Sequence, residues 1–365
     1  MTSQTFQHQR PSVTHSKPCL SGKDQKAIDV VLRSGMVAEG NFVREFEHAV
    51  GQYLGLLGGV ATPSGTAALF LAMRSLGIGN RNEVIIPTYV CRSVWDAVKA
   101  TGAEPVLCDI GENWCVNEDT IKPHITSRTK AIIVVHTFGI MAEVAPICRF
   151  GIPVIEDSCQ ALGARWDGKM AGTIGDFCVL SFHATKLLTT GEGGMVLTKD
   201  RKWLSMLRDV KQAKDIGELI AYRQPMSDLQ GALGLSQLSQ YERFLKRRRL
   251  IADYYFTHLQ GLPIQLPRHI RHRSIFFRFP LRIGGDFEVL RTLFDAAGIQ
   301  VRHGVDILLH RIFKARSSKF PMARKYFNET VSIPLYPALK RNEYERVVGA
   351  CQLILANGDT QRVQK

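Results

Sequence analysis

The chain has 365 residues, a formal net charge of +14 and a hydrophobic content of 45%. This composition is ordinary for a globular protein and excludes disordered and fibrous classes. The polar N-terminus (1–17) lacks the apolar run of a signal peptide, and no stretch is apolar enough for a membrane-spanning helix, so we expect a cytoplasmic protein without a membrane partner.

The eight cysteines and the excess of basic residues narrow the choice of partners. No two cysteines form a CxxC pair, so we expect free thiols in a reducing compartment and no metal site. The basic run 246–249 lies in a helical pattern, where such runs are usually a solvated face. No nucleic-acid module accompanies it, so we expect anionic small molecules and not nucleic acid as partners.

In chain order, the sequence predicts a large α/β domain followed by a smaller one. Residues 1–20 are expected to be a flexible segment. From residue 58 onward, short apolar runs alternate with helical segments, as in a mostly parallel sheet covered by helices on both faces. The runs expected to form strands are 58–62, 82–90, 104–110, 131–139, 152–159, 176–183 and 193–198.

The pattern changes after residue 198. The sequence predicts a helix over 200–210 and a long helical stretch over 227–260. Beyond it, a strand pattern over 274–283 and a helix pattern over 287–298 indicate an α+β unit. We therefore expect a large cofactor-binding α/β domain over 21–250 and a small C-terminal α+β domain over 251–365.

Three motifs follow predicted strands, where open α/β sheets bind their ligands. The turn "PSGTAAL" (63–69) is either a phosphate-binding helix N-terminus or an ordinary N-cap. Asp157 and Gln160 follow a buried strand, and the carboxylate needs a partner, which could be structural or the ring nitrogen of a cofactor. Lys186, in "SFHATK" (181–186), is either a solvated turn residue or a reactive amine.

Together these motifs supply what pyridoxal phosphate (PLP) requires. A lysine forms the Schiff base, an acid keeps the pyridine nitrogen protonated, and a helix N-terminus with a hydroxyl holds the phosphate. Each motif is weak alone, but their order and company indicate a PLP site.

The sequence resembles the DegT/DnrJ sugar aminotransferases, a branch of the fold-type I PLP enzymes, from about residue 22 to about residue 350. The resemblance is carried by "SGMVAEGNFVREFE", "SGTAALFLAM", "VIEDSCQALGA", "GTIGDFCVLSFHATKLLTTGEGGMV", "MSDLQGALGLSQL" and "VSIPLYPALKRNEYERV". It implies a large domain with a mostly parallel sheet, a smaller C-terminal domain, and a homodimer whose active sites lie at the subunit interface.

The resemblance also assigns residues. It places Lys186 on the Schiff-base lysine, Asp157 on the partner of the pyridine nitrogen, and Gln160 beside the cofactor ring. The phosphate-binding residues that it implies are Gly65, Thr66 and Ser181.

The chain departs from the family pattern at two positions. Relatives usually carry an aromatic residue that stacks on the ring where this chain has Cys91. Either Tyr89 substitutes for it, or the Cys91 thiol and its neighbours pack on the ring. Relatives often carry an asparagine that reaches the phosphate in the partner subunit where this chain has Arg223. An arginine there would keep the role with a stronger donor.

The activity that the resemblance implies is amino transfer from an amino acid, glutamate or glutamine, to a keto-sugar that is commonly nucleotide-linked, in amino-sugar biosynthesis. One alternative is a pyridoxamine-phosphate-dependent sugar dehydratase, in which histidine replaces the lysine; Lys186 argues against it. The other is a non-catalytic binding or regulatory member of the family, which the intact Lys186 and Asp157 disfavour.

Overall fold

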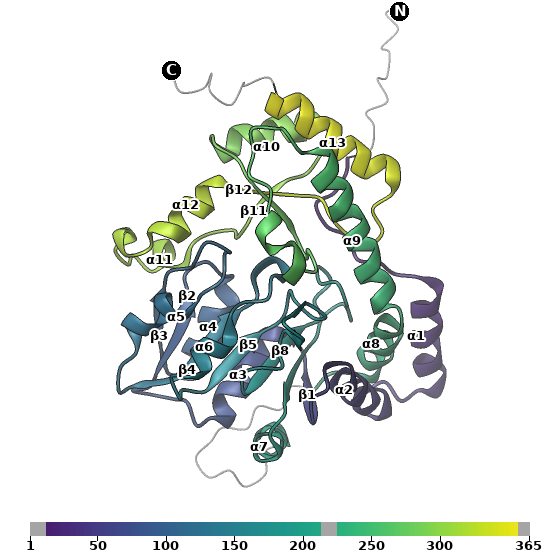
Figure 1. Ribbon diagram of the computed structural model, residues 1–365. Coiled ribbons are helices and arrows are strands. Elements are labelled where there is room, and N and C mark those ends of the chain that lie inside the picture. Colours follow the sequence, from purple (N-terminus) through teal and green to yellow (C-terminus); the bar gives the residue numbers. More distant parts are fainter. Residues whose placement is uncertain (1–11, 213–224, 357–365) are drawn as a thin grey trace, which may run out of the picture.

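A seven-stranded sheet in the order β1-β9-β8-β5-β4-β2-β3 forms the centre of the larger part of the molecule (Figure 1). The structure, a computed structural model, describes residues 12–212 and 225–356. Strands β8, β5, β4, β2 and β3 are parallel neighbours, whereas β9 runs antiparallel to β8 and β1. The strands are β1 (Gly58–Thr62), β2 (Glu83–Pro87), β3 (Glu104–Cys108), β4 (Thr129–Val135), β5 (Val154–Asp157), β8 (Phe177–Ser181) and β9 (Gly194–Thr198). This mostly parallel sheet confirms the predicted fold class.

Helices cover both faces of the sheet, which is why its strands are apolar along their whole length. Alternate residues of β8 show the two sides: Phe177 and Val179 pack into one buried cluster, and Cys178 and Leu180 into another. The helices of this part are α1 (Gly22–Ser34), α2 (Asn41–Leu54), α3 (Gly65–Ser75), α4 (Arg92–Ala100), α5 (Glu118–Ile121), α6 (Val144–Cys148), α7 (Arg201–Gln212), α8 (Asp228–Ser239) and α9 (Tyr241–His258). A two-stranded hairpin of β6 (Arg165–Trp166) and β7 (Lys169–Met170) follows β5.

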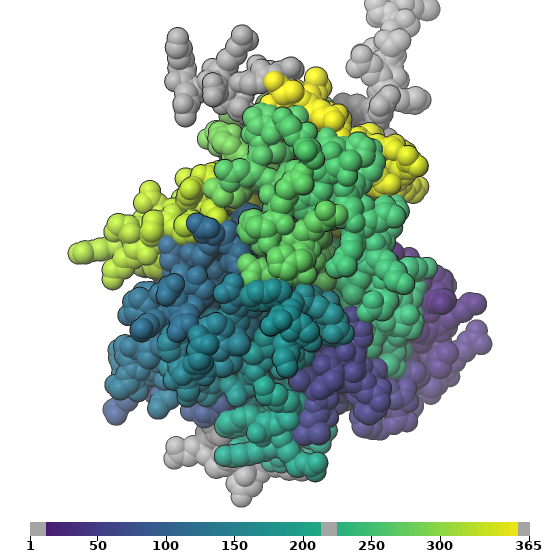
Figure 2. Space-filling model, viewed as in Figure 1, coloured from purple at the N-terminus to yellow at the C-terminus, as the bar shows by residue number. Residues whose placement is uncertain are grey.

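The C-terminal part is built on a three-stranded antiparallel sheet in the order β10-β12-β11. It lies against the sheet-bearing part, and α9 runs from one to the other (Figures 1 and 2). A separate buried cluster, which includes Phe256, Phe279 and Val347, forms its core. Its elements are β10 (Phe279–Arg282), α10 (Phe287–Ala296), β11 (Arg302–His303), α11 (Leu309–Ile312), α12 (Pro321–Glu329), β12 (Thr330–Ile333) and α13 (Arg341–Ala356).

The segment expected to be flexible is described from residue 12 onward, and there it contacts the C-terminal part. Val13 exchanges backbone hydrogen bonds with Gly298 and Gln300, at 2.8 and 3.0 Å. The His15 ring lies 2.8 Å from the Ser332 hydroxyl. Residues 13–15 are thus anchored beside β12, a strand that is distant from them in the sequence.

Two elements differ from the sequence-based expectations. The helical stretch over 227–260 is divided at Gln240, whose side chain donates to Asp24 at 3.0 Å. The expected strand over 274–283 shortens to β10 because residues 274–275 hydrogen-bond with residues 139–140 instead. The expected domain boundary at residue 250 falls inside α9, so the division into two domains stays a prediction. No helix in the described ranges is long and apolar enough to cross a membrane.

Candidate active site

Two polar residues end neighbouring parallel strands at the same edge of the sheet. Asp157 is the last residue of β5, and Ser181 is the last residue of β8. The register pairs Asp157 with Val179, two residues before Ser181. Asp157 is buried, and its carboxylate accepts a hydrogen bond from the Cys159 N–H at 3.1 Å. The sheet topology alone thus brings these two side chains together, as the sequence predicts.

Lys186 lies in the loop between β8 and β9, and several backbone contacts hold this loop. Phe182 donates to the Gly193 carbonyl and accepts from Thr190, at 2.8 and 2.9 Å, which closes the base of the loop. The Lys186 N–H donates to the His183 carbonyl at 2.8 Å. The side chain is half-buried, and its Nζ lies 5.3 Å from the centroid of the Phe277 ring. The amine is therefore held in a cavity and is not a freely solvated turn residue.

The N-terminus of α3 packs directly against Ser181. Ser64 caps the helix by accepting from the Ala67 N–H at 3.1 Å, which leaves the N–H groups of Gly65 and Thr66 as free donors of the first turn. A Cβ atom added at Gly65 would lie 2.9 Å from the Ser181 Cβ. A larger residue than glycine would therefore displace Ser181, and the contact places the helix N-terminus and the hydroxyl at one spot.

Gln160 is held with one end of its amide toward the cavity. Its Oε1 accepts from the Phe138 N–H at 2.8 Å, which leaves the side-chain NH2 group to donate elsewhere. Gln160 and Lys186 line both hollows at this edge of the sheet. One is a narrow pocket that also contains Cys159 and Ser181, and the other is a cavity of about 230 Å³ that opens toward the C-terminal part.

Of the two residues expected to contact a cofactor ring, Cys91 lines the larger cavity and Tyr89 does not. Cys91 is exposed at the start of α4. Tyr89 is fully buried, packs edge-on against Phe138, and would clash with a Cβ atom added at Gly304. The structure therefore places Tyr89 in the core, because its side chain fills the space between the sheet and the Gly304 backbone.

Electrostatic effects link Asp157 and Lys186 to two thiols. The surrounding protein keeps water from the Cys91 thiol, and this loss of hydration raises its pKa. The negative charge of Asp157 raises the pKa further, while the positive charge of Lys186 lowers it. The pKa of Cys159 is raised well above its usual value, with burial as the main cause and opposing effects from the same two residues. Both thiols are therefore protonated at neutral pH and are poor nucleophiles, so they do not compete with the Lys186 amine for an aldehyde.

Behind Asp157 lies a buried carboxylate that the sequence analysis did not identify. Glu156 is fully buried, and it accepts from the N–H groups of Gly172, Ile174 and Gly175 at 2.8, 2.7 and 2.6 Å and from His136 Nε2 at 2.8 Å. Two consecutive acids at the end of an apolar strand were the available signal, because successive residues of a strand point to opposite faces. One acid faces the cavity edge, and the other needs a complete set of internal donors.

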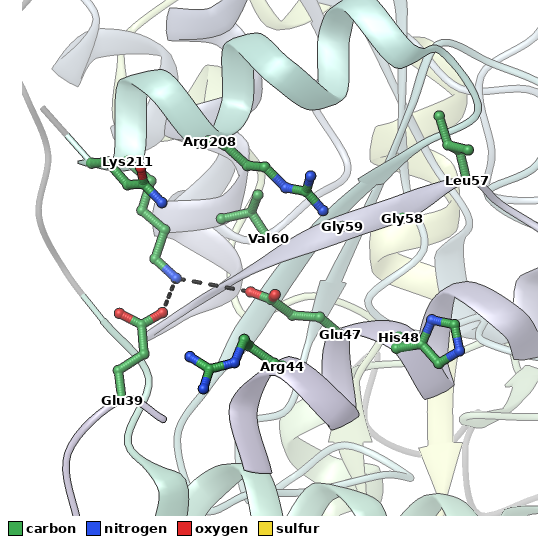
Figure 3. Close-up of a pocket in the computed structure, with 11 residues that line it drawn as sticks. Glu39, Arg44, Glu47, His48, Leu57, Gly58, Gly59, Val60, Arg208 and Lys211 are labelled. Atoms are coloured by element: carbon green, nitrogen blue, oxygen red, sulfur yellow. Dashed lines mark hydrogen bonds and ion pairs between the residues drawn. The ribbon is translucent and has the colours of Figure 1, made fainter. Parts of the chain in front are cut away.

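A separate and larger hollow of about 780 Å³ lies at the outer edge of the sheet beside β1 and α7 (Figure 3). Three of its charged side chains pair with one another. Lys211 contacts Glu39 and lies 3.8 Å from Glu47, as the dashed lines in Figure 3 show. Of the described residues predicted for cofactor binding, none lines it, so it is not the site that the sequence motifs indicate.

The residues at this edge of the sheet fit PLP. An amine (Lys186) and a strand-end carboxylate (Asp157) lie with a helix N-terminus and a hydroxyl (Ser181), the donor set for the aldehyde, the ring nitrogen and the phosphate. Arg223, predicted to reach a phosphate, lies outside the described residues. This site and the sheet around it define a PLP enzyme of fold-type I.

The chain belongs to the DegT/DnrJ/EryC1/StrS aminotransferase family, whose sequence model matches residues 18–352. The Bacillus subtilis spore coat polysaccharide biosynthesis protein SpsC is 32% identical, over 94% of this chain and 97% of its own. GDP-perosamine synthase of Escherichia coli O157:H7 is 30% identical, over 93% and 96%. The PLP form of the sugar aminotransferase Spr1654 from Streptococcus pneumoniae superposes with a TM-score of 0.88 at 25% identity, covering 95% of this chain and 99% of that one. The predicted enzyme class, an aminotransferase that uses PLP, is confirmed.

Proposed function

We propose that this enzyme transfers the amino group of an amino acid to the keto group of a nucleotide-linked sugar, as a homodimer, with Lys186 and Asp157 as its catalytic residues. The observation that carries the proposal is that Lys186 and Ser181 line one pocket, while Asp157 ends the strand beside β8 and the α3 N-terminus packs against Ser181. The acceptor class is supported by the relative named for GDP-perosamine synthesis, and amino-sugar biosynthesis by that relative and by the spore coat polysaccharide protein.

The side chains around the cavity have distinct roles in this proposal. Bound PLP supplies an aldehyde that links to amines and a ring that withdraws electrons from the carbon attached to it. Asp157 holds a proton on the ring nitrogen. Gln160 would donate through its side-chain NH2 to the hydroxyl oxygen carried by the cofactor ring, because its Oε1 is already bonded to Phe138. The N–H groups of Gly65 and Thr66, with the Ser181 hydroxyl, bind the phosphate.

Lys186 has two tasks. Its amine would hold the cofactor through the aldehyde, and the loop contacts of Phe182 and His183 would keep the amine near the same place when it is free. The free amine then moves a proton between the donor Cα and the cofactor C4′. A general base must lie within hydrogen-bond reach of both atoms, and the backbone contacts of the loop would limit how far the amine moves from them.

The test of this proposal is chemical labelling. Protein purified with PLP should absorb visible light, and borohydride should then fix a pyridoxyl group on the peptide that contains Lys186. Lys186→Ala should bind no cofactor covalently and should lose amino transfer, while it keeps the thermal stability of the wild type because the side chain lies in a loop. Label on another lysine, or amino transfer by Lys186→Ala with glutamate as donor, would overturn the assignment.

A further inference from the structure

The cavity beside Lys186 is lined by more positive charge than its predicted cofactor contacts use. Asp306 is the one acidic side chain among its described lining residues. The cationic lining residues are Lys17, Lys186, Arg248, Arg278 and Arg302. Neither Lys186 nor the arginines of this cavity form an ion pair within 4.0 Å in the part of the chain that the structure describes. The lining is therefore suited to an anion.

Arg248 is occupied by the fold. Its side chain is buried, its Nε donates to the Phe276 carbonyl at 2.8 Å, and its guanidinium also contacts the Phe277 carbonyl. Burial lowers the pKa of Arg248 to about 9. These bonds fix the backbone just before β10, next to the ring over which Lys186 lies, and they leave Arg278 and Arg302 as the arginines available to a ligand.

Arg278 and Arg302 reach the cavity from the two outer strands of the C-terminal sheet. Arg278 immediately precedes β10, and Arg302 opens β11, with β12 between the two strands. Arg278 donates through Nη1 to the carbonyls of His303 and Gly304, at 2.8 and 3.1 Å. Arg302 is exposed and has no side-chain hydrogen bond within the described ranges. One guanidinium is thus held in place, and the other is free to turn toward a ligand.

The two guanidinium groups repel each other. Burial lowers the pKa of Arg278, and the positive charge of Arg302 lowers it further, while Asp306 opposes this only in part. His15 adds no further positive charge, because burial and then Arg278, Arg302 and Arg248 lower its pKa well below its usual value and keep it neutral. An anion bound between the arginines would relieve this repulsion.

We propose that Arg278 and Arg302 form an oxyanion subsite that binds a substrate beside the cofactor and so helps to determine specificity. This inference rests on the proposed function, in which two substrates use the same cavity in turn. Both of them carry oxyanions: the amino donor has carboxylates, and a nucleotide-linked sugar has phosphates. The planar guanidinium fork suits either group, since it can donate two parallel hydrogen bonds.

The test measures binding of two unreactive anions to the PLP-loaded enzyme by calorimetry. Glutarate represents a donor carboxylate, and GDP or UDP represents the phosphates of the acceptor. Arg302→Gln should weaken binding of at least one of them about 10- to 100-fold, as loss of a charged hydrogen bond predicts. Arg302→Lys should recover part of the affinity. Arg291→Gln, which removes an exposed arginine paired with Glu288 on α10, should leave the affinity within about twofold of the wild type.

The outcomes distinguish the amino donor from the acceptor as the source of the anion. They also distinguish failure of the subsite from failure of the proposed function. Loss of glutarate binding alone assigns the subsite to the amino donor, loss of nucleotide binding alone assigns it to the acceptor, and loss of both assigns a shared subsite. Failure of the wild type to bind either anion, or equal binding by wild type, Arg302→Gln and Arg278→Lys, overturns the subsite. The proposed function fails separately, through the absence of borohydride label on Lys186. Retention of the visible band of the cofactor shows that each variant is folded.

Activity gives a second reading that a purely structural role would not produce. If the arginines bind the donor, Arg302→Gln should raise the KM for glutamate and leave kcat nearly unchanged, because the bond is made equally before and during the reaction. If they bind the acceptor, the KM for the keto-sugar should rise instead. A fall in kcat with both KM values unchanged would contradict a binding role.

Discussion

Replacing Glu156 by glutamine should destabilise the protein strongly, although the two side chains have nearly the same shape. Each carboxylate oxygen of Glu156 accepts two hydrogen bonds: Oε1 from the Ile174 and Gly175 N–H groups, and Oε2 from Gly172 N–H and His136 Nε2. Glutamine offers one acceptor oxygen and one NH2 group. Whichever way the amide is turned, its NH2 group would face two of the buried N–H donors, and these donors would have no acceptor.

A change of histidine tautomer cannot repair this mismatch. His136 Nδ1 accepts from the Ala142 N–H at 3.0 Å, so the ring proton resides on Nε2 and is donated to Glu156. Moving the proton to Nδ1 would let Nε2 accept from the glutamine amide, but it would set two N–H groups against each other at Ala142. The variant must leave donors unpaired in either tautomer.

The expected loss in the free energy of unfolding is about 3–5 kcal/mol, the usual cost of breaking a buried charged network. With an unfolding entropy of about 2.1 cal/mol/K per residue, this corresponds to a fall in Tm of roughly 4–6 °C for the 365-residue chain. Glu104→Gln is the matched control. Glu104 is exposed and paired with Lys99 at 3.0 Å, so its loss should cost less than about 1 kcal/mol.

The loss should also depend on pH. Burial raises the pKa of Glu156, but the hydrogen bond and charge interaction with His136 and the bonds from Gly175 and Gly172 outweigh it, so the pKa is lowered. A carboxyl with a lowered folded-state pKa stabilises the fold above its unfolded pKa of about 4.3 and loses this contribution as the pH falls through the folded value. The gap between wild type and Glu156→Gln, measured by thermal and urea unfolding, should shrink between pH 7 and pH 3. A gap below 1 kcal/mol at pH 7, or one that does not change with pH, would refute the reasoning.

Four further predictions concern the cavity. Asp157→Asn should keep some cofactor but lose most of the amino-transfer rate, and an undiminished rate would make Asp157 a structural acid. Cys91→Phe should lower the dissociation constant of PLP about 2- to 10-fold through stacking on the ring; an unchanged constant in a protein of normal Tm would place Cys91 away from the ring. Because the pKa of His15 is lowered, wild type should lose stability below about pH 6.5, by up to about 1.4 kcal/mol per pH unit. His15→Gln should lose less stability over the same range, and parallel pH curves for the two proteins would exclude His15 as a cause. Mixing Arg223→Ala with Lys186→Ala subunits should restore activity if Arg223 serves the partner's site, and absence of recovery despite subunit exchange would contradict that role.

The sequence by itself determined the features that depend on local pattern. Apolar runs followed by helical segments predicted the parallel sheet, because a strand buried on both faces must be apolar throughout. A strand that ends in a parallel sheet brings its last residues to a common edge, so Asp157 and Ser181 could be placed together without coordinates. The order of the motifs and their resemblance to a family then predicted Lys186 as the reactive amine.

Only the tertiary structure decided which residues from distant parts of the chain share the cavity. Lys17, Arg278 and Arg302 lie far apart in sequence but line the same cavity. Arg278 and Arg302 come from the two strands that flank β12, and Lys17 comes from the N-terminal segment, which packs beside β12. Tyr89 and Cys91 are two residues apart, yet Tyr89 enters the core and Cys91 the cavity, because Tyr89 packs against Phe138 and Gly304. Such choices depend on long-range packing, for which a single sequence carries no local signal.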